Sequence, residues 1–325
     1  MAIAPVRWGL LSTAAINDKL LAAAARSRRL EVLAVASREQ ARATAYAGER
    51  GIDLAYGSYE ELLADPGIEA VYISLPNSLH VEWSVRALRA GKHVLCEKPF
   101  SRHPGEVEHA FDVAESEGRI LMEAFMYRHH PQTARLQELV ADGAVGSLRL
   151  IRATFSFALG AGPSILLDLA LDGGGLMDVG CYCVNAARLL AGEPQRVFAE
   201  RMAGPSGVDE VFAATMRFPG QVLAQFDCGL RLPERDELEA IGEEGSVFAD
   251  DPWHCREPVL ELRGGSGSER IAVERADPYL LQLDNMSGAI RGEAEPLLGR
   301  RDALGQALTI DALLRSAEAG RPVDL

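Results

Sequence analysis

Lysine is rare in this chain, and one lysine stands where a catalytic group would be useful. Of the 33 basic residues among 325, only three are lysines: Lys19, Lys92 and Lys98. Lys98 follows an apolar run over residues 93–96 and directly precedes a proline. Ligands of open α/β sheets bind beyond the carboxyl ends of the strands. Position and scarcity together predict a functional lysine, the alternative being an ordinary surface lysine.

A second polar group follows three consecutive glycines at residues 173–175. Asp178, Tyr182 and Asn185 are spaced i, i+4 and i+7, so one helix would carry them as a polar stripe among apolar neighbours. Buried polar side chains need hydrogen-bond partners or a lined cavity. The stripe is therefore either a functional site or a satisfied core tyrosine with an aspartate at the helix start.

The residues 9–16, GLLSTAAI, lie between the first apolar run and a helical pattern. A dinucleotide site wants a glycine-rich turn here, so that backbone N–H groups and the helix N-terminus meet the pyrophosphate. Only Gly9 remains of the G-x-x-G-x-G form, but the replacements Ser12 and Ala14 are small. The alternative is an ordinary turn in which Ser12 or Thr13 caps the helix.

The second strand ends at Ser37-Arg38, with no acid before Glu39. NAD sites commonly place an acidic side chain here, whereas NADP sites place an arginine near the 2′-phosphate. An arginine can fork onto a phosphate, so NADP is favoured over NAD. Ser37 and Gln40 also have the spacing of a capping box, a role compatible with cofactor binding.

The elements that must position these residues form two blocks. Up to residue 124, apolar runs at 6–11, 31–36, 70–75, 93–96 and 120–124 alternate with helical patterns at 15–26, 39–50, 78–90 and 104–117. Strands buried on both faces read as continuous apolar runs. The alternation predicts an N-terminal Rossmann domain of α/β class, with a doubly wound parallel sheet.

The pattern changes after about residue 130. Helical patterns at 131–142 and 175–191 precede several strand-like runs between residues 197 and 273, and helices at 279–291 and 303–319 close the chain. This predicts a C-terminal α+β domain with a mostly antiparallel open sheet. We expect a dinucleotide-binding domain at 1–124 and a substrate-binding and oligomerisation domain at 125–325, whose last helix packs back on the first domain.

Composition excludes several classes of protein. The net charge of −14 disfavours nucleic-acid and anionic-membrane surfaces, which need a dense basic face. Five scattered cysteines without a CxxC pair, and the isolated pair His129-His130, indicate no metal site. Because residues 1–11 lack a signal-peptide pattern and no run of 18 apolar residues occurs, we expect a cytoplasmic protein without a membrane span.

The motifs together resemble one family over essentially the whole chain, the Gfo/Idh/MocA oxidoreductases. Its carriers are the first turn, PNxxH at 76–80, AGKHVLCEKP at 90–99, EAFMYR at 123–128 and GGGxxDxGxY at 173–182. The ASR ending of the second strand and the segment MDVGCY most resemble the branch of NADP-dependent D-xylose 1-dehydrogenases and dimeric dihydrodiol dehydrogenases. Related NADP-dependent sugar ketoreductases share much of this pattern.

The resemblance implies roles at matching positions. Lys98 would be the catalytic lysine near the nicotinamide, Tyr182 the acid/base where many members carry histidine, and Asp178 would orient the substrate or the tyrosine. Where related chains often carry arginine, this chain has Leu166, which leaves the exact sugar open. The other expected contacts are Gly9, Ser12, Thr13, Ala14, Ile16, Ser37, Arg38, Leu75, Pro76, Asn77, His80 and Glu97 for the cofactor, and Arg128, Asp168 and Asn185 for the substrate.

The expected function is hydride transfer between NADP and a sugar or polyol, resembling D-xylose 1-dehydrogenase. The alternatives are a trans-dihydrodiol dehydrogenase, a ketosugar reductase and, in another class, a non-catalytic NADP(H)-sensing regulatory protein. An antiparallel sheet covered on one face must bury its other apolar face. We therefore expect a homodimer or homotetramer through the C-terminal sheet, with Val211, Ala213, Val222 and Ala224 as candidates for that face.

Overall fold

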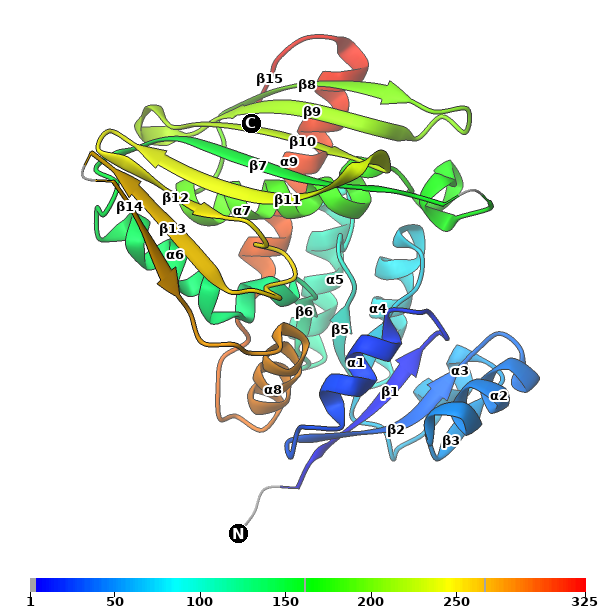
Figure 1. Cartoon of the computed structure of the whole chain (residues 1–325). Coiled ribbons are helices and arrows are strands. Elements are labelled where there is room, and N and C mark those ends of the chain that lie inside the picture. The colour runs from blue at the N-terminus through cyan, green and yellow to red at the C-terminus, as the bar shows by residue number, and fades with distance from the viewer. Residues whose placement is uncertain (1–3, 161, 266) are drawn as a thin grey trace. The chain divides into compact units, whose positions relative to one another are not determined.

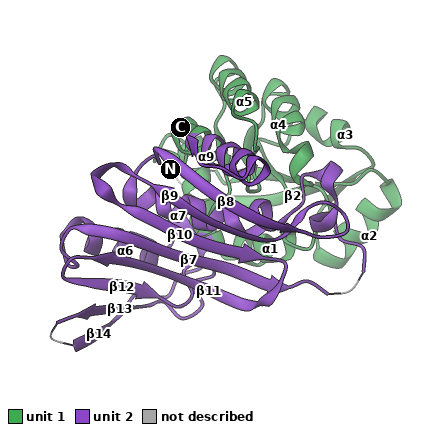
Figure 2. Cartoon of the chain, turned by 90° about the horizontal axis from the view of Figure 1, so that it is seen from above, with its two compact units in different colours: residues 1–126, 279–304 green, residues 127–278, 305–325 purple. Residues whose placement is uncertain are grey.

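The computed structural model describes residues 4–160, 162–265 and 267–325 (Figure 1). The segment 1–11 considered for a signal peptide lies partly outside these residues. The chain forms two compact units, coloured separately in Figure 2. The first holds Met1–Met126 and Tyr279–Leu304, and the second holds Tyr127–Pro278 and Gly305–Leu325. The segment Tyr279–Leu304 therefore joins the first unit, although it is far from it in sequence.

The first unit is built on a six-stranded parallel sheet. Its strand order is β3-β2-β1-β4-β5-β6, with a crossover between the two halves. This confirms the predicted doubly wound Rossmann sheet. The strands are β1 (Val6–Leu11), β2 (Leu30–Ala36), β3 (Leu54–Tyr56), β4 (Ala70–Ile73), β5 (His93–Cys96) and β6 (Leu121–Glu123), and the helices are α1 (Asn17–Ala24), α2 (Gln40–Arg50), α3 (Tyr59–Ala64), α4 (His80–Arg89), α5 (Pro104–Ser116) and most of α8 (Pro278–Ile290).

Two elements of this unit were not predicted, β3 and α3, because both are short. β3 has three residues and none of them is fully buried. α3 has six residues, and the Ser58 side chain begins it by accepting a hydrogen bond from the backbone N–H of Glu61. Elements of this length carry too few apolar positions to show a period.

The second unit is built on a nine-stranded sheet in the order β14-β13-β12-β11-β7-β10-β9-β8-β15. Within the part of the chain that the structure describes, only β7 and β10 of this sheet pair in parallel, which confirms the predicted mostly antiparallel sheet. The strands are β7 (Leu148–Ala158), β8 (Arg196–Ala203), β9 (Asp209–Arg217), β10 (Leu223–Gly229), β11 (Arg231–Gly242), β12 (Gly245–Ala249), β13 (Val259–Gly264), β14 (Gly267–Ala272) and β15 (Val323–Asp324), and the helices are α6 (Pro131–Ala141), α7 (Cys181–Ala191) and most of α9 (Arg300–Ala319).

The central strand β7 was missed by the sequence analysis. It lies between β11 and β10, and α7 packs on it, with the ring of Phe155 in contact with the ring of Tyr182 on α7. α6 packs on the same sheet near β12 and β13. Two arginines interrupt the apolar run of β7, at 149 and 152, and both side chains are exposed. Alternation of this kind marks a strand with one buried face.

The uncovered face of this sheet is more polar than expected. Of the four residues proposed for it, Ala213 is exposed and Val211 half-buried, but Val222 and Ala224 are buried. Ala224 precedes Gln225 on β10, and successive residues of a strand point to opposite faces. Charged side chains such as Arg152, Glu200 and Glu237 lie on exposed positions. The prediction that this face of the sheet is apolar is therefore wrong.

No helix of the described residues combines the length and the apolar character that a membrane span requires.

Candidate active site

The β1–α1 turn has the backbone of a glycine-rich loop although it has few glycines. Ser12 has φ of 136°, a region that favours glycine, and it occupies the position of the second glycine of the motif. Its Oγ accepts from the Ala14 N–H at 3.1 Å and lies 2.8 Å from the Ser74 Oγ. Hydrogen bonding thus ties this turn to the end of β4.

Asn17 completes that link and was not singled out from the sequence. It is fully buried, its Nδ2 donates to the Ser12 carbonyl at 2.9 Å, and its Oδ1 accepts from the Ser74 hydroxyl at 2.7 Å. No side chain caps α1, so the predicted cap by Ser12 or Thr13 does not form. Gly9 has a packing reason, since a Cβ there would lie 2.8 Å from a methyl of Leu62.

The end of β2 carries a buried serine and two nearby arginines. Ser37 is buried and Arg38 exposed. Glu39 is the N-cap residue of α2, with no side-chain cap, so the capping box of Ser37 and Gln40 is absent. Arg42 donates from Nε to the Thr13 hydroxyl at 2.7 Å, which joins α2 to the β1–α1 turn.

Arg38 and Arg42 both affect the pKa of Tyr59. Burial raises the pKa of Tyr59, and the positive charges of Arg38 and Arg42 oppose that rise. Arg38 directly follows Ser37 at the end of β2, and Arg42 of α2 reaches the β1–α1 turn through Thr13. Arg42 was missed by the sequence analysis, although an arginine four positions after Arg38 was a usable signal.

His80 links the ends of β4 and β5. Its ring nitrogens lie 2.9 Å from the Pro99 carbonyl oxygen and 2.8 Å from the Leu75 carbonyl oxygen, and the side chain is fully buried. Burial lowers the pKa of His80 to about 4, so the ring is neutral at pH 7. These two hydrogen bonds hold the ends of β4 and β5 together, and the predicted cofactor contact of His80 stays a prediction.

Lys98 stands directly beyond β5 and is half-buried. Its backbone N–H donates to Glu97 Oε2 at 3.3 Å, and the peptide bond to Pro99 is cis. Glu97 also accepts a hydrogen bond from the hydroxyl of Tyr72 on β4. Pro76 and Asn77, after β4, are half-buried. The strand ends thus bring Lys98, Glu97 and Asn77 to one edge of the sheet, as predicted.

This edge fits a dinucleotide. The positive φ at Ser12 and the small Ala14 let a ligand approach the backbone, and the N-terminus of α1 follows directly. Ser37, Arg38 and Arg42 place a hydroxyl and two guanidinium groups after β2 and at the start of α2. The first unit therefore has both parts that a nicotinamide dinucleotide requires.

In the second unit, the predicted helix at 175–191 begins as a π-helix. Leu176–Gly180 forms this π turn, and α7 follows at Cys181. π turns occur mostly as single turns within helices, often at functional sites. Asp178 lies on the π turn and Tyr182 on α7, so the simple α-helical stripe applies only from Cys181 onward.

A buried aspartate from β9 starts this helix, and the sequence analysis missed it. Asp209 is 3% exposed, and its Oδ2 accepts from the Leu176 N–H at 2.6 Å. A Cβ on Gly174 would lie 2.3 Å from Asp209 Oδ1, and Gly174 has φ of 125°. Burial raises the pKa of Asp209 to about 6. The glycines are therefore needed so that the carboxylate can reach the helix N-terminus.

Aromatic side chains surround Tyr182. Its ring lies 5.3 Å from the Phe155 ring, 5.8 Å from the Tyr127 ring and 5.8 Å from the Trp253 ring, centroid to centroid. Tyr182 is 5% exposed. Packing of this kind fixes the ring orientation of a tyrosine, so its hydroxyl is held in place by three neighbours.

Asn185 makes several hydrogen bonds inside the second unit. Its Oδ1 accepts from the Tyr127 hydroxyl at 2.6 Å and from Arg128 Nη1 at 3.0 Å, and it is fully buried. Its Nδ2 lies 3.5 Å from Gln306 Oε1. These bonds show that Asn185 positions Tyr127 and the half-buried Arg128, and its predicted contact with the substrate stays a prediction.

Asp168 lies in an exposed segment before the glycines. Its Oδ1 accepts from the Ala170 N–H at 2.9 Å and begins a 3₁₀ turn. The neighbouring Leu166 carbonyl would lie 2.5 Å from a Cβ on Gly173. Asp168 thus has a structural part in shaping the segment that leads into the helix of Tyr182.

A Rossmann sheet with an edge that fits a dinucleotide defines the first unit as a dinucleotide-binding domain. Residues 6–125 match the family model described as an oxidoreductase family with an NAD-binding Rossmann fold, and residues 133–248 match the GFO/IDH/MocA C-terminal domain. The chain belongs to the Gfo/Idh/MocA family, which confirms the resemblance. It is an enzyme that acts on CH–OH groups.

The curated relatives are similar over most of the chain. An uncharacterised oxidoreductase of Rhizobium meliloti is 40% identical over 97% of this chain and 98% of its own. D-xylose 1-dehydrogenase (NADP(+)) 2 of Haloferax volcanii is 38% identical over 98% and 99%. The trans-1,2-dihydrobenzene-1,2-diol dehydrogenase of Mus musculus is 37% identical over 78% of each chain.

Solved structures agree in fold. An aldose-aldose oxidoreductase from Caulobacter crescentus, complexed with glycerol, has a TM-score of 0.91 at 28% identity and covers 99% of this chain and 100% of its own. A 3-ketoreductase from Actinomadura kijaniata, in complex with NADP and TDP-benzene, has a TM-score of 0.90 at 30% identity over 96% and 98%.

Proposed function

We propose that this enzyme is an NADP-dependent dehydrogenase or reductase of sugars or polyols, similar to D-xylose 1-dehydrogenase. The observation that carries the proposal is the pair Lys98 and Tyr182. The 3-ketoreductase of Actinomadura kijaniata has been solved with one lysine replaced by alanine and with one tyrosine replaced by phenylalanine. Those two residues are as many positions apart in that chain as Lys98 and Tyr182 are here.

The chemistry explains why such a pair is needed. Oxidation of an alcohol needs a base for the O–H proton and an acceptor for the hydride, and the nicotinamide supplies the acceptor when bound. A free tyrosine, with a pKa of about 10, is a poor base at pH 7. We propose that the Lys98 ammonium, acting on the same substrate hydroxyl as Tyr182, favours the phenolate and stabilises the developing alkoxide. Asp178 orients the substrate or Tyr182.

The preference for NADP over NAD is a proposal supported by charge. Arg38 and Arg42 place two guanidinium groups near the end of β2, and no acidic residue stands before Glu39. An arginine binds a phosphate through paired hydrogen bonds, whereas a ribose hydroxyl pairs best with a carboxylate. Two similar proteins support NADP as the cofactor: the Haloferax volcanii enzyme is an NADP(+) dehydrogenase, and the Actinomadura kijaniata 3-ketoreductase was solved with NADP.

The substrate class is proposed from the relatives and tested by a screen. D-Xylose comes first, and trans-dihydrodiols and ketosugars are the alternatives. The screen measures NADP+ and NAD+ reduction over aldoses, polyols and dihydrodiols, and NADPH oxidation over ketosugars. Turnover with an aldose and NADP+ supports the proposal. Tight NADP(H) binding without turnover over the panel would instead favour the non-catalytic sensor.

The decisive variants are Lys98→Ala and Tyr182→Phe. We expect each to lower kcat with the established substrate by roughly 100-fold or more, as removal of an acid/base group does. Lys19→Ala is the matched control, since Lys19 is an exposed lysine of α1. Turnover close to that of the wild type in both variants would exclude the assigned roles.

We also propose a cytoplasmic homodimer or homotetramer. All five cysteines of the chain are free and buried, which agrees with a reducing compartment. On the uncovered face of the nine-stranded sheet, Phe198 and Leu223 are 36% and 40% exposed, and Phe198 lines a hollow of about 600 Å³. A second copy could cover these side chains. Sedimentation at micromolar concentration tests this, and a monomer would exclude it.

A further inference from the structure

The connection between β12 and β13, residues 250–258, carries a tryptophan into the surroundings of Tyr182. Trp253 is fully buried, and its ring lies 5.8 Å from the Tyr182 ring and 6.0 Å from the Phe155 ring. Its Nε1 donates to the Thr154 carbonyl at 3.1 Å. The position of this connection therefore decides how two of the three rings around Tyr182 are packed.

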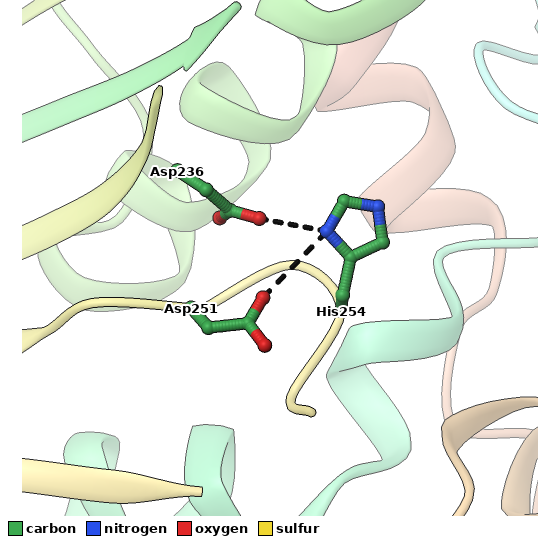
Figure 3. Close-up of side chains that lie close together, drawn as sticks. All are labelled: Asp236, Asp251 and His254. Carbon is green, nitrogen blue, oxygen red and sulfur yellow. Dashed lines mark hydrogen bonds and ion pairs between the residues drawn. The ribbon is translucent and has the colours of Figure 1, made fainter. Parts of the chain in front are cut away.

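A cluster of titratable side chains holds this connection in place, and Figure 3 shows it. His254 Nδ1 lies 2.7 Å from Asp236 Oδ2 and 3.6 Å from Asp251 Oδ1. Both carboxylates thus point at one ring nitrogen, which carries a proton and donates it. Asp236 lies on β11 and the other two on the connection, so the cluster joins the connection to the sheet.

The cluster also contacts the aromatic packing directly. The backbone N–H of Trp253 points to Asp236 Oδ1 at 3.5 Å. The His254 ring meets the Phe155 ring edge-on, with centroids 5.6 Å apart. Asp236 is the register partner of Phe155 in the β11–β7 pair. A change in the cluster would therefore move Trp253 and Phe155 together.

The charges around His254 balance when it is protonated. Arg256 donates from its backbone N–H and from Nε to Asp251 Oδ2, at 2.6 and 3.1 Å, and its Nη2 lies 3.7 Å from Asp236 Oδ2. Two carboxylates then face two cations. Glu234 adds one exposed carboxylate 3.4 Å from Arg256, and the Cys255 thiol, whose pKa burial raises, adds no charge.

This balance fits a proton better than a metal ion. The three side chains are the only group of metal-ligating type found in the described residues, but their shared centre is the His254 nitrogen itself. A metal would have to displace that proton and would face Arg256 at short range. Burial raises the pKa of Asp236 to about 6, and hydrogen bonds to the two carboxylates raise that of His254. Both shifts favour retention of one proton by the pair.

We propose that Asp236, Asp251 and His254 are positioning residues that, while they share a proton, hold Trp253 and Phe155 against Tyr182. The inference rests on the proposed role of Tyr182 for its effect on catalysis. Its effect on Trp253 is a property of the second unit alone. A rise in pH removes the Nε2 proton of the His254 imidazolium, while Nδ1–H still donates to Asp236. Two carboxylates then face the single cation Arg256, and the connection loosens.

The first experiment follows Trp253 without substrate. The emission of the wild type minus that of Trp253→Phe reports this tryptophan, and it is measured from pH 6 to pH 9. We expect the difference spectrum to change as the cluster loses its proton. In His254→Gln, measured against the double variant with Trp253→Phe, that change should shift or disappear, because only the Asp236 carboxyl can still titrate. A flat difference spectrum in the wild type, or an unchanged titration in His254→Gln, would overturn the proposal.

The second experiment measures catalysis. His254→Gln is expected to lower kcat roughly 10- to 100-fold, because a small misplacement of a catalytic group costs this much, while the Kd for NADPH stays unchanged. Arg275→Gln is the control, because it removes an exposed ion pair with Glu257 next to the connection and leaves the cluster intact. Unchanged kcat in His254→Gln would overturn the catalytic part.

The two experiments separate failure of this inference from failure of the proposed function. If Tyr182→Phe keeps wild-type turnover, the assignment of Tyr182 fails, while the fluorescence titration still tests the cluster.

Metal analysis of the purified protein is the third measurement. A stoichiometric metal whose removal by a chelator changes the Trp253 emission would replace the shared proton by an ion and overturn the proposal.

Discussion

Replacement of Gly174 by alanine tests how the helix of Tyr182 is started. A non-glycine residue at φ of 125° costs about 1–3 kcal/mol. The added Cβ would also lie 2.3 Å from Asp209 Oδ1, so the carboxylate must move and lose its hydrogen bond to the Leu176 N–H. A hydrogen bond to a charged group contributes about 1.5–3 kcal/mol. We expect Gly174→Ala to destabilise the second unit by about 3–5 kcal/mol.

Two other glycines separate the cost of the backbone conformation from the cost of displacing Asp209. Gly192 has φ of 82° but open space around its Cβ position, so Gly192→Ala should show only the backbone cost. Gly48 lies exposed in α2 with neither restriction, and Gly48→Ala should stabilise by about 0.5–1 kcal/mol. At about 2–4 °C per kcal/mol, Gly174→Ala should lower Tm by roughly 6–20 °C.

The assay is thermal unfolding of the three variants, followed by circular dichroism, with kcat measured well below Tm. A Gly174→Ala loss no greater than that of Gly192→Ala would refute the argument that Asp209 requires this glycine. The double variant Gly174→Ala with Asp209→Ala adds a direct test. Without the carboxylate, the alanine should cost less than it does in the wild type, because the two sites are coupled.

The remaining predictions concern cofactor choice and pH. Arg42→Ala should weaken NADPH binding by about 1.5–3 kcal/mol, or roughly 10- to 100-fold, with little change in NADH binding. If binding titrations show equal losses of affinity for NADPH and NADH, Arg42 does not contact the 2′-phosphate. The pKa of His80 in the folded protein is about 4, which is below its unfolded value. As the pH falls, the unfolded state therefore binds a proton at His80 before the folded state does. The free energy of unfolding should decrease by up to about 3 kcal/mol as pH falls from about 6.5 to 4. His80→Gln should reduce the difference in Tm between pH 7 and pH 4.5, and the exposed His109→Gln should not. Asp209 has the opposite sign, because its folded pKa of about 6 lies above the unfolded value, and the protein should lose up to about 3 kcal/mol as pH rises from about 4 to 6. Asp209→Asn, measured by urea unfolding against the wild type, should remove that loss, and an unchanged pH slope would count against it.

Local pattern was sufficient for most of the first unit. Strands of a parallel sheet are buried on both faces, so β4 and β5 read as short apolar runs between helical patterns. The order of those elements places Lys98 after a strand, at the edge where such sheets bind ligands. The spacing of Tyr182 and Asn185 likewise predicted that they share a helix, as they do on α7.

What pattern could not supply is which distant segments become neighbours. The register of β11 on β7 sets Asp236 opposite Phe155, and β9 brings Asp209 to the glycines before Asp178. Strand neighbours follow from burial of the whole sheet and not from local preference.

The same limit decided the parts played by two polar residues. The sequence analysis expected a substrate contact at Asn185 and did not single out Arg42. The fold bonds Asn185 to Tyr127 and Arg128, and it brings Arg42 to the β1–α1 turn. The sequence by itself determined the class of sheet and singled out Lys98 and Tyr182 as candidates for the site. Only the tertiary structure decided which polar atoms were already bonded, because hydrogen-bond partners are chosen by packing between segments far apart in the chain.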